Sequence, residues 1–162
     1  MMGLPWLTVA HIEGMSVRDA ETLAEIHADA FRRTWSPHEF TALLADPSVF
    51  ALGVRLRSLF GARRIVGFVL VRFAADEAEI LTIAVCQRQR RRGFGRMLME
   101  DVIRRLYRER IATLFLEVEG ANAPAVALYR SLGFDVAGER RNYYAKPAAG
   151  DGTALVMRLQ VR

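Results

Sequence analysis

The sequence predicts a mixed α/β fold in which four helices flank a mostly antiparallel seven-stranded sheet, in the order β-α-α-β-β-β-α-β-α-β-β. Apolar-rich and alternating segments mark the strands, and the clearest pair, Arg64–Ala74 and Glu77–Val85, is separated by a two-residue turn. After that pair, an apolar residue at every fourth position marks a long amphipathic helix. Because this helix lies between two strands, we expect one right-handed β-α-β crossover within the sheet.

The amino-terminal part is expected to form one strand and two helices. The strand lies within Leu7–Ile12. Ser16 is placed to cap a helix over Val17–Phe31, because a serine side chain accepts a hydrogen bond from the first turn of a helix. Ser36 caps the second helix, which begins with a proline and ends near Ala45, since proline is well tolerated at the first helical position.

The middle of the chain is expected to contain three strands and the long helix. A strand over Val49–Arg57 precedes the pair Arg64–Ala74 and Glu77–Val85, which Ala75-Asp76 joins as a hairpin. The helix runs from about Gly93 to Arg110. Its four-residue apolar repeat predicts a core-facing stripe made of Phe94, Leu98, Val102 and Leu106.

A short strand over Thr113–Val118 begins the carboxyl-terminal part. Strand alternation predicts two faces, one with Leu114, Leu116 and Val118 and the other with Phe115, Glu117 and Glu119. Asn122 then caps a helix that ends at Leu132, and Gly133 is the expected stop signal.

The chain is expected to close with an antiparallel pair, Phe134–Arg141 and Ala154–Val161, connected by a loop over Lys146–Gly152. No repeat, linker or low-complexity segment interrupts the 162 residues. We therefore expect a single domain over residues 1–162.

The composition favours a globular protein, because 52% of the residues are hydrophobic. Cys86 is the only cysteine, so no internal disulfide is possible. No signal peptide or membrane span is recognisable, and we expect a cytoplasmic protein that does not associate with membranes. The net charge is +5, and almost all of the positive charge is arginine, since Lys146 is the only lysine. This charge favours an anionic partner, either a cofactor or a nucleic acid.

The segment Gln87–Arg96 combines an arginine run with Gly93 and Gly95 between a strand and a helix. Glycines at a helix start let the backbone approach a ligand and point unpaired N–H groups at it, which favours a phosphate group. The segment lacks the P-loop pattern, and Leu98 stands where a dinucleotide fingerprint needs its third glycine. The alternative interpretations are a strand–helix turn that binds nothing and a solvated charged surface.

Glu117, Asn122 and Tyr129 form a second candidate set. Asn122 and Tyr129 are two helical turns apart, roughly 10 Å along one helix face, and Glu117 lies near the end of the preceding strand. A carboxylate can take a proton from an amine nucleophile and a phenol can give one to a leaving thiolate, so the set suits acyl transfer from a thioester. Glu119 is the rival base. Taken singly, these residues are also typical of a strand end, a helix cap and a core aromatic.

The three histidines are scattered, and none forms a ligand cluster with Cys86, so the sequence predicts no metal site. His27 falls within a predicted helix, where we expect it to line a surface or a groove.

The loop pattern Arg90-Arg-Arg-Gly93-Phe-Gly95 resembles the pyrophosphate loop of the GNAT superfamily of acyl-CoA-dependent N-acyltransferases. Within that superfamily the chain looks like a bacterial ribosomal-protein-alanine N-acetyltransferase over nearly its whole length. The shared segments include Thr113–Val118, Asn122 with Tyr129, and the more selective string Arg140-Arg-Asn-Tyr-Tyr144.

The resemblance implies acetyl-CoA as the acetyl donor, Glu117 as the general base and Tyr129 as the general acid. It also implies that the coenzyme is bound by Ile83, Ala84, Val85, Arg90, Arg91, Arg92, Gly93, Phe94, Gly95, Arg96 and Asn122. The backbone of Ile83–Val85 would hold the pantetheine arm, and the loop would hold the pyrophosphate.

The expected activity is therefore transfer of an acetyl group to a protein N-terminal α-amine, the N-terminal alanine of a small-subunit ribosomal protein, by direct attack in a ternary complex. One alternative is a GNAT enzyme that acetylates a lysine or a small-molecule amine, and another is a related protein that binds acyl-CoA without catalysis. A third is a non-catalytic RNA-binding module that uses Arg88–Arg96, although no recognised nucleic-acid motif is present and we expect no direct nucleic-acid binding. The sequence leaves the oligomeric state open.

Overall fold

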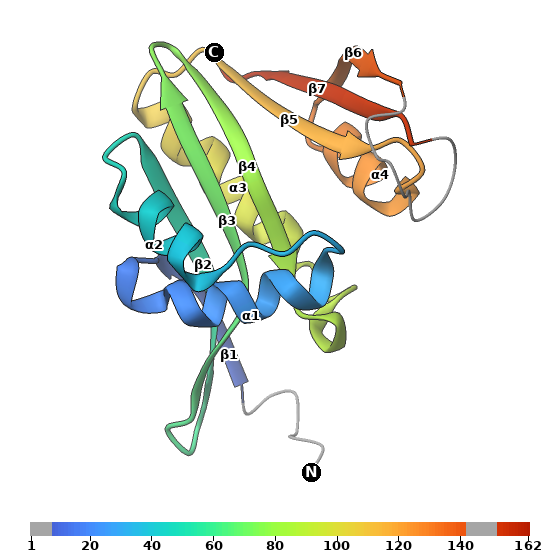
Figure 1. The fold of residues 1–162 in the computed structure, drawn as a ribbon. Coiled ribbons are helices and arrows are strands. Elements are labelled where there is room, and N and C mark those ends of the chain that lie inside the picture. Colours follow the sequence, from blue (N-terminus) through green and yellow to red (C-terminus); the bar gives the residue numbers. More distant parts are fainter. Residues whose placement is uncertain (1–7, 142–151) are drawn as a thin grey trace. The chain divides into compact units, whose positions relative to one another are not determined.

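A computed structural model describes residues 8–141 and 152–162 (Figure 1). In this part of the chain it contains the seven strands and four α-helices that the sequence predicts, in the predicted order. The chain divides into two compact units. The first extends to Arg72 and includes Leu81–Val102, and the second comprises Phe73–Ile80 and the residues from Ile103 onward.

The strands form a mixed sheet in the order β1-β2-β3-β4-β5-β7-β6. Their bounds are β1 Thr8–Gly14, β2 Val49–Ser58, β3 Arg63–Ala74, β4 Glu77–Val85, β5 Thr113–Glu119, β6 Asp135–Arg140 and β7 Ala154–Gln160. β1 with β2, β2 with β3, β5 with β7 and β6 with β7 pair antiparallel. β4 and β5 pair in parallel, which confirms the predicted crossover.

Two helices of the first unit follow the capping signals in the sequence. α1 (Ala20–Ala30) is preceded by a 3₁₀ turn over Val17–Asp19, so the predicted helix over Val17–Phe31 begins with a tighter turn. α2 (Pro37–Ala45) starts with a capping box: the Glu39 N–H donates to Ser36 Oγ at 3.1 Å, and the Ser36 N–H donates to the Glu39 carboxylate at 2.6 Å.

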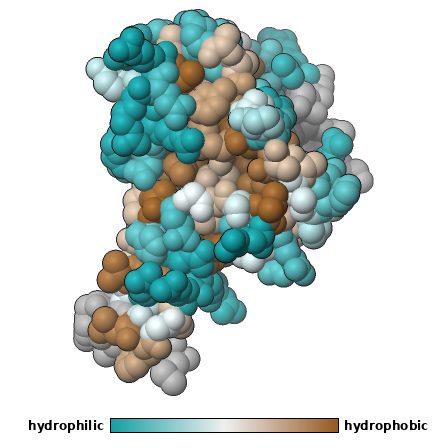
Figure 2. Space-filling model, turned by 90° about the vertical axis from the view of Figure 1, so that its left-hand side faces the viewer, coloured by the Kyte–Doolittle hydropathy of each residue, from teal (hydrophilic) through white to brown (hydrophobic). Residues whose placement is uncertain are grey.

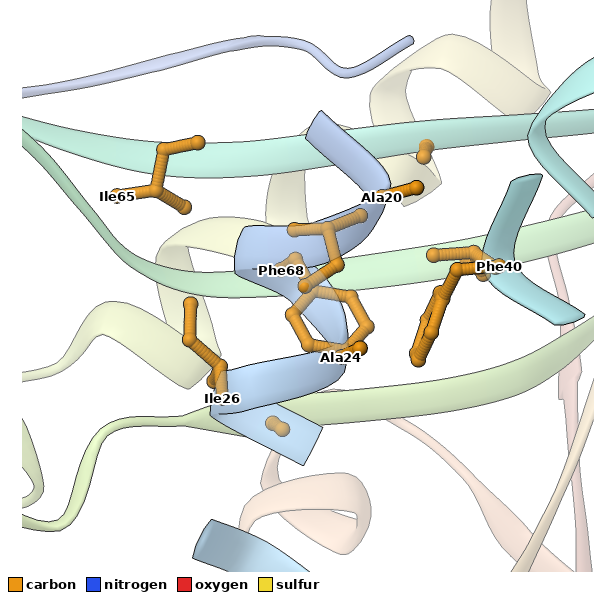
Figure 3. Packing of buried hydrophobic residues seen from close by; sticks show 10 residues of the cluster. Ala20, Ala24, Ile26, Phe40, Ile65 and Phe68 are labelled. Atoms are coloured by element: carbon orange, nitrogen blue, oxygen red, sulfur yellow. The ribbon is translucent and has the colours of Figure 1, made fainter. Parts of the chain in front are cut away.

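A hydrophobic cluster lies where α1 and α2 pack on the strands of the first unit (Figure 3). Phe68 on β3 and Phe40 on α2 are both fully buried, and their rings meet edge to face with centroids 5.6 Å apart. Figure 3 shows the Phe68 ring close to Ala24, whose small side chain lets the helix backbone come near the sheet.

His27 belongs to this core, so the expectation that it lines a surface or a groove is wrong. The residue is 3% exposed. Its ring stacks on Phe31 and on Trp35, with centroids 4.4 and 4.8 Å away, and meets the edge of Phe40 at 5.5 Å. The Trp35 N–H donates to His27 Nδ1 at 3.4 Å. The aromatic residues after α1 therefore fold back over the histidine, an arrangement that helical periodicity does not reveal.

α3 (Phe94–Arg108) presents the predicted apolar stripe, and all four of its residues are buried. Arg110 follows the helix with φ +61°, a left-handed conformation that ends the helical run. This end falls two residues before the predicted one.

In the second unit, α4 (Ala123–Ser131) is bounded as the sequence predicts. The Ala125 N–H donates to Asn122 Oδ1 at 3.3 Å, so Asn122 is the N-cap. At the other end Gly133 has φ +101°, and the N–H groups of Gly133 and Phe134 bond to the carbonyls of Arg130 and Tyr129, both at 3.0 Å. This pattern is the Schellman motif, which ends the helix at the glycine.

The remaining expectations for the carboxyl-terminal part also agree with the structure. On β5, Leu114, Leu116 and Val118 are buried as the alternation predicts. β6 and β7 form the predicted antiparallel pair. The predicted loop lies outside the described residues except for Gly152. At the other end of the chain, the first strand, β1, runs from Thr8 to Gly14, two residues past the predicted end at Ile12, and Leu7 lies outside the described residues.

We predict that Phe68→Ala lowers the free energy of unfolding by about 3–5 kcal/mol, because it leaves a cavity beside Phe40. Urea denaturation measures this change. Phe60→Ala is the matched control, since Phe60 is 88% exposed in the turn after β2. Figure 2 shows that hydrophobic residues also lie on the surface of one face of the protein. The control is expected to stay within about 0.5 kcal/mol of the wild type. Equal losses in both variants would contradict this placement of the core.

We predict that His27 makes folding stability depend on pH. Burial lowers the pKa of His27 below its ordinary 6.5, against a weaker opposite effect of Glu39. The His27 side chain is therefore protonated more readily in the unfolded chain than in the folded chain. Its contribution to the free energy of unfolding is fully present above about pH 6.5 and is lost as the pH falls through that value. Urea denaturation between pH 7 and pH 5 should give a flatter profile for His27→Gln than for wild type. The exposed His38→Gln variant should keep the wild-type slope.

Candidate active site

The segment between β4 and α3 forms a tight turn whose outer side is accessible. β4 ends at Val85, a short 3₁₀ turn covers Gln87–Gln89, and α3 begins at Phe94. Arg91 and Gly93 both have left-handed backbones, with φ +64° and φ +82°. A Cβ atom built at Gly93 meets no atom within 4 Å, so its outer side is open. The turn therefore leads an accessible backbone into the start of a fifteen-residue helix, where N–H groups lack intrahelical partners.

Most arginines of this turn have partners within the protein. Arg90 Nε donates to the Val85 carbonyl at 3.3 Å, and the Arg92 guanidinium bonds to the Gln89 side chain and lies over the Phe94 ring. Arg96 pairs with Glu100 one helical turn further on, at 3.7 Å. These contacts stabilise the conformation of the turn, so the arginines contribute to its structure as well as to its positive charge.

The β4 residues before the turn lie against β3. Ala84 is buried, while Ile83 and Val85 are half-buried. A Cβ atom at Gly67 of β3 would come within 3.1 Å of the Ala84 carbonyl oxygen and 3.2 Å of the Val85 side chain. Gly67 therefore permits the close approach of the two strands, which fixes the path of β4 into the turn.

Glu117 lies on the face of β5 opposite its buried leucines. It stands across from Val156 on β7, and its side chain keeps 28% of its surface accessible. Arg140 on β6 reaches it, with 3.1 Å between Arg140 Nη1 and Glu117 Oε1. The sequence interpretation used Arg140 only as part of a family string and missed this ion pair. Asn142, Tyr143 and Tyr144 of the same string lie outside the described residues.

Tyr129 is buried in the second unit. It is 6% exposed, and its ring is tilted against Phe134 with centroids 5.8 Å apart. Burial raises the pKa of Tyr129 to about 12. The hydroxyl is therefore protonated at neutral pH and can act as a hydrogen-bond donor.

The candidate residues fall into two sets by unit. Glu117, Asn122 and Tyr129 belong to the second unit, and Arg90–Arg96 with Ile83–Val85 belong to the first. Asn122 is confirmed as a helix cap that uses its side-chain oxygen. Its amide nitrogen makes no hydrogen bond to the described residues.

The described residues give no support for a reactive cysteine, a metal site or a membrane-spanning helix. Burial raises the pKa of the half-buried Cys86 thiol, so the reactive thiolate is disfavoured. Over residues 8–141 and 152–162, no three histidine, cysteine, aspartate or glutamate side chains gather as metal ligands. Within the same ranges no helix has both the length and the apolar composition to span a membrane.

Comparison with known proteins identifies the family. The Acetyltransferase (GNAT) family matches residues 20–134. The chain belongs to the GNAT acetyltransferase family. A curated relative from Haemophilus influenzae, a ribosomal protein bS18-alanine N-acetyltransferase, is 34% identical over 139 residues, which are 86% of this chain and 90% of the relative.

Another curated relative and a solved structure are also named as alanine N-acetyltransferases of the same ribosomal protein. The Salmonella typhimurium bS18-alanine N-acetyltransferase is 45% identical over 98 residues, and the match covers 60% of this chain and 66% of the relative, just under two thirds of its length. The crystal structure of the ribosomal-protein-S18-alanine N-acetyltransferase from Escherichia coli superimposes with a TM-score of 0.83 at 32% identity, covering 94% of both chains. The GNAT fold predicted from the sequence is thereby confirmed.

We predict that Gly93→Ala raises the KM for acetyl-CoA. The substitution meets no steric obstacle but forces an L-residue into a left-handed backbone, which costs about 1–2 kcal/mol and favours a shift of the turn. Gly61→Ala is the matched control, because Gly61 has φ +87° and equally open surroundings in the β2–β3 turn. Steady-state kinetics should show a raised KM only for Gly93→Ala. An unchanged KM for acetyl-CoA in Gly93→Ala would contradict a role of this turn in binding the coenzyme.

Proposed function

We propose that the protein is an acetyl-CoA-dependent N-acetyltransferase that acetylates a protein N-terminal α-amine, that of the N-terminal alanine of a small-subunit ribosomal protein. Membership of the GNAT family, together with relatives named for this reaction, supports the activity and the acceptor. The accessible, ion-paired Glu117 on β5 is the observation that carries the catalytic part of the proposal.

The turn before α3 fits a ligand that carries phosphate groups. Its left-handed Gly93, its open outer side and its position at a helix start are the features that anion-binding turns need. We assign the pyrophosphate of acetyl-CoA to Arg90–Arg96, its pantetheine arm to the backbone of Ile83–Val85, and a further contact to Asn122. Bound there, the coenzyme supplies an acetyl group activated as a thioester.

Glu117 is assigned the role of general base. An α-amine has a pKa of about 7.7–8.0, so a large part of it is protonated at neutral pH and cannot attack a carbonyl. The carboxylate accepts this proton directly or through a water, and the neutral nitrogen then attacks the thioester carbon. Glu119 projects from the same face of β5 and is the alternative base. The C–N bond forms and the C–S bond breaks without a covalent enzyme intermediate, so Cys86 is not required.

Tyr129 is assigned the role of general acid toward the leaving sulfur. Its pKa of about 12 lies above the value of about 8.5 that is typical of a thiol. Complete proton transfer from the phenol to the thiolate is therefore uphill. The hydroxyl stabilises the developing negative charge as a hydrogen-bond donor. The protonated amine gives up two protons in forming the amide: the first goes to Glu117, and the second balances the proton that the sulfur gains as coenzyme A leaves, so Tyr129 ends the reaction protonated.

The acceptor determines the partner and the location that we propose. A ribosomal-protein acceptor places the enzyme in the cytoplasm, as one domain over residues 1–162 that needs no direct contact with nucleic acid. The second candidate, a GNAT enzyme that acetylates lysine or a small amine, uses the same residues and differs only in the amine that is bound.

We predict that the protein releases coenzyme A when it is mixed with acetyl-CoA and a ribosomal peptide that begins with alanine. Glu117→Gln should lower kcat by about 10²- to 10⁴-fold, because a general base contributes about this much. Glu139→Gln on β6 is the matched control and should keep wild-type activity. Thiol release is followed in a coupled assay, with the same peptide carrying a blocked α-amine as the blank.

Three results would contradict parts of the proposal. Absence of turnover above the blank would reject the activity. Faster turnover of a free lysine or a polyamine would favour the second candidate. Full activity of Glu117→Gln would reject the assigned base, and full activity of Tyr129→Phe would reject the assigned acid.

A further inference from the structure

The ion pair between Glu117 and Arg140 joins two strands that are not neighbours. β7 lies between β5 and β6, and all three strands belong to the second unit. Arg140 nevertheless places Nη1 at 3.1 Å from Glu117 Oε1. A side chain that crosses a whole strand to reach one carboxylate needs a clear path, and the sheet register provides it.

The register sets Glu117 in one row with Val156 and Gly138, and Glu119 in the next row with Ala154 and Arg140. Directly opposed residues project from the same face of a sheet. Gly138 has no side chain, and a Cβ atom built there meets nothing within 4 Å. The Arg140 side chain therefore has open space toward the row of Glu117.

A β-bulge decides which residue of β6 faces Glu117. The pairing shifts between Val136, opposite Met157, and Gly138, opposite Val156, so that one extra residue, Ala137, is accommodated. Without the extra residue the alternation would be inverted, and Glu139 rather than Arg140 would project beside Glu117. The bulge thus replaces a repelling carboxylate with a guanidinium.

The pair holds only one of the two carboxylate oxygens. Oε1 of Glu117 is bound to Arg140, and Oε2 has no partner among residues 8–141 and 152–162. The Arg140 side chain is 56% exposed, and ion pairs in such surroundings contribute little to folding stability. The effect of the pair is therefore expected in the orientation of Glu117, with Oε1 anchored and Oε2 left to receive a proton.

We propose that Arg140 is a positioning residue that holds Glu117 so that Oε2, the oxygen not bound to Arg140 Nη1, meets the ammonium group of the acceptor. This inference rests on the proposed function, because it assigns Arg140 a role only through Glu117 as the base.

Kinetics of Arg140→Gln, Arg140→Lys, Glu117→Gln and the double variant Arg140→Gln/Glu117→Gln test the proposal in the full-length protein. Arg140→Gln should lower kcat by up to about 100-fold, because a reactive group displaced by about 1 Å can cost this much, and should leave the KM for acetyl-CoA unchanged. Arg140→Lys should recover part of kcat, because it keeps a cation at the same place. In the Glu117→Gln background, Arg140→Gln should cause no further loss.

Arg158→Gln is the matched control. Arg158 is exposed on β7 in the row of Phe115 and Asp135, on the same face of the same three strands, so its loss removes an equal charge without touching the pair. This control should keep the wild-type kcat. Circular dichroism and thermal unfolding establish that each variant is folded, and Arg140→Lys serves as the test if Arg140→Gln is not.

Wild-type kcat in Arg140→Gln, or a further loss of activity in the double variant, would overturn the positioning role. A loss in Arg158→Gln equal to that in Arg140→Gln would overturn it as well, because general positive charge would then suffice. If Glu117→Gln lowers kcat and Arg140→Gln does not, only this inference fails. If the wild type acetylates no amine, or Glu117→Gln is fully active, the proposed function fails and the inference falls with it.

Discussion

The register of β5 against β7 is the constraint on which the candidate site residues of the second unit depend. Leu114, Leu116 and Val118 are buried, so the alternation of the strand leaves Glu117 on the accessible face. A slip of one residue would bury the carboxylate and expose the leucines, and the apolar burial makes that slip unfavourable. The core therefore fixes the orientation of a catalytic candidate that contributes nothing to the core itself.

Several features of the second unit follow from this register. β7 occupies the position between β5 and β6, the bulge in β6 brings Arg140 to the Glu117 face, and α4 follows β5 after a short turn. α4 is bounded by the Asn122 cap and the Gly133 stop, which fix the place of Tyr129 along the helix. Local backbone signals thus determine where the phenol lies, and burial raises its pKa to about 12.

Much of the fold could be predicted from the sequence because its signals are local. Strand alternation, the apolar stripe of α3, the Ser36 cap and the Gly133 stop each act within a few residues. The glycine-containing turn before α3 could also be predicted, since Gly93 has the left-handed backbone that favours glycine. The structure adds that the neighbouring arginines brace this turn, which composition alone could not distinguish from a solvated charged surface.

What the sequence did not reveal depends on contacts between distant residues. His27 is buried because aromatic residues after α1 fold over it, and helical periodicity carries no information about that segment. The Arg140–Glu117 pair depends on a bulge and on a strand that lies between its partners. The raised pKa of Tyr129 depends on burial, whereas its position on the helix was predicted correctly.

The central claim is that this GNAT enzyme acetylates the α-amine of a ribosomal protein with Glu117 as its base. Mass spectrometry of protein N-termini in the native host tests it most directly, in cells with the gene, without it, and with only the Glu117→Gln form. The account predicts that an alanine-initiated small-subunit ribosomal protein loses its N-terminal acetyl group both without the gene and with the variant. Unchanged N-termini in all three strains, or a loss confined to lysine acetylation, would contradict it.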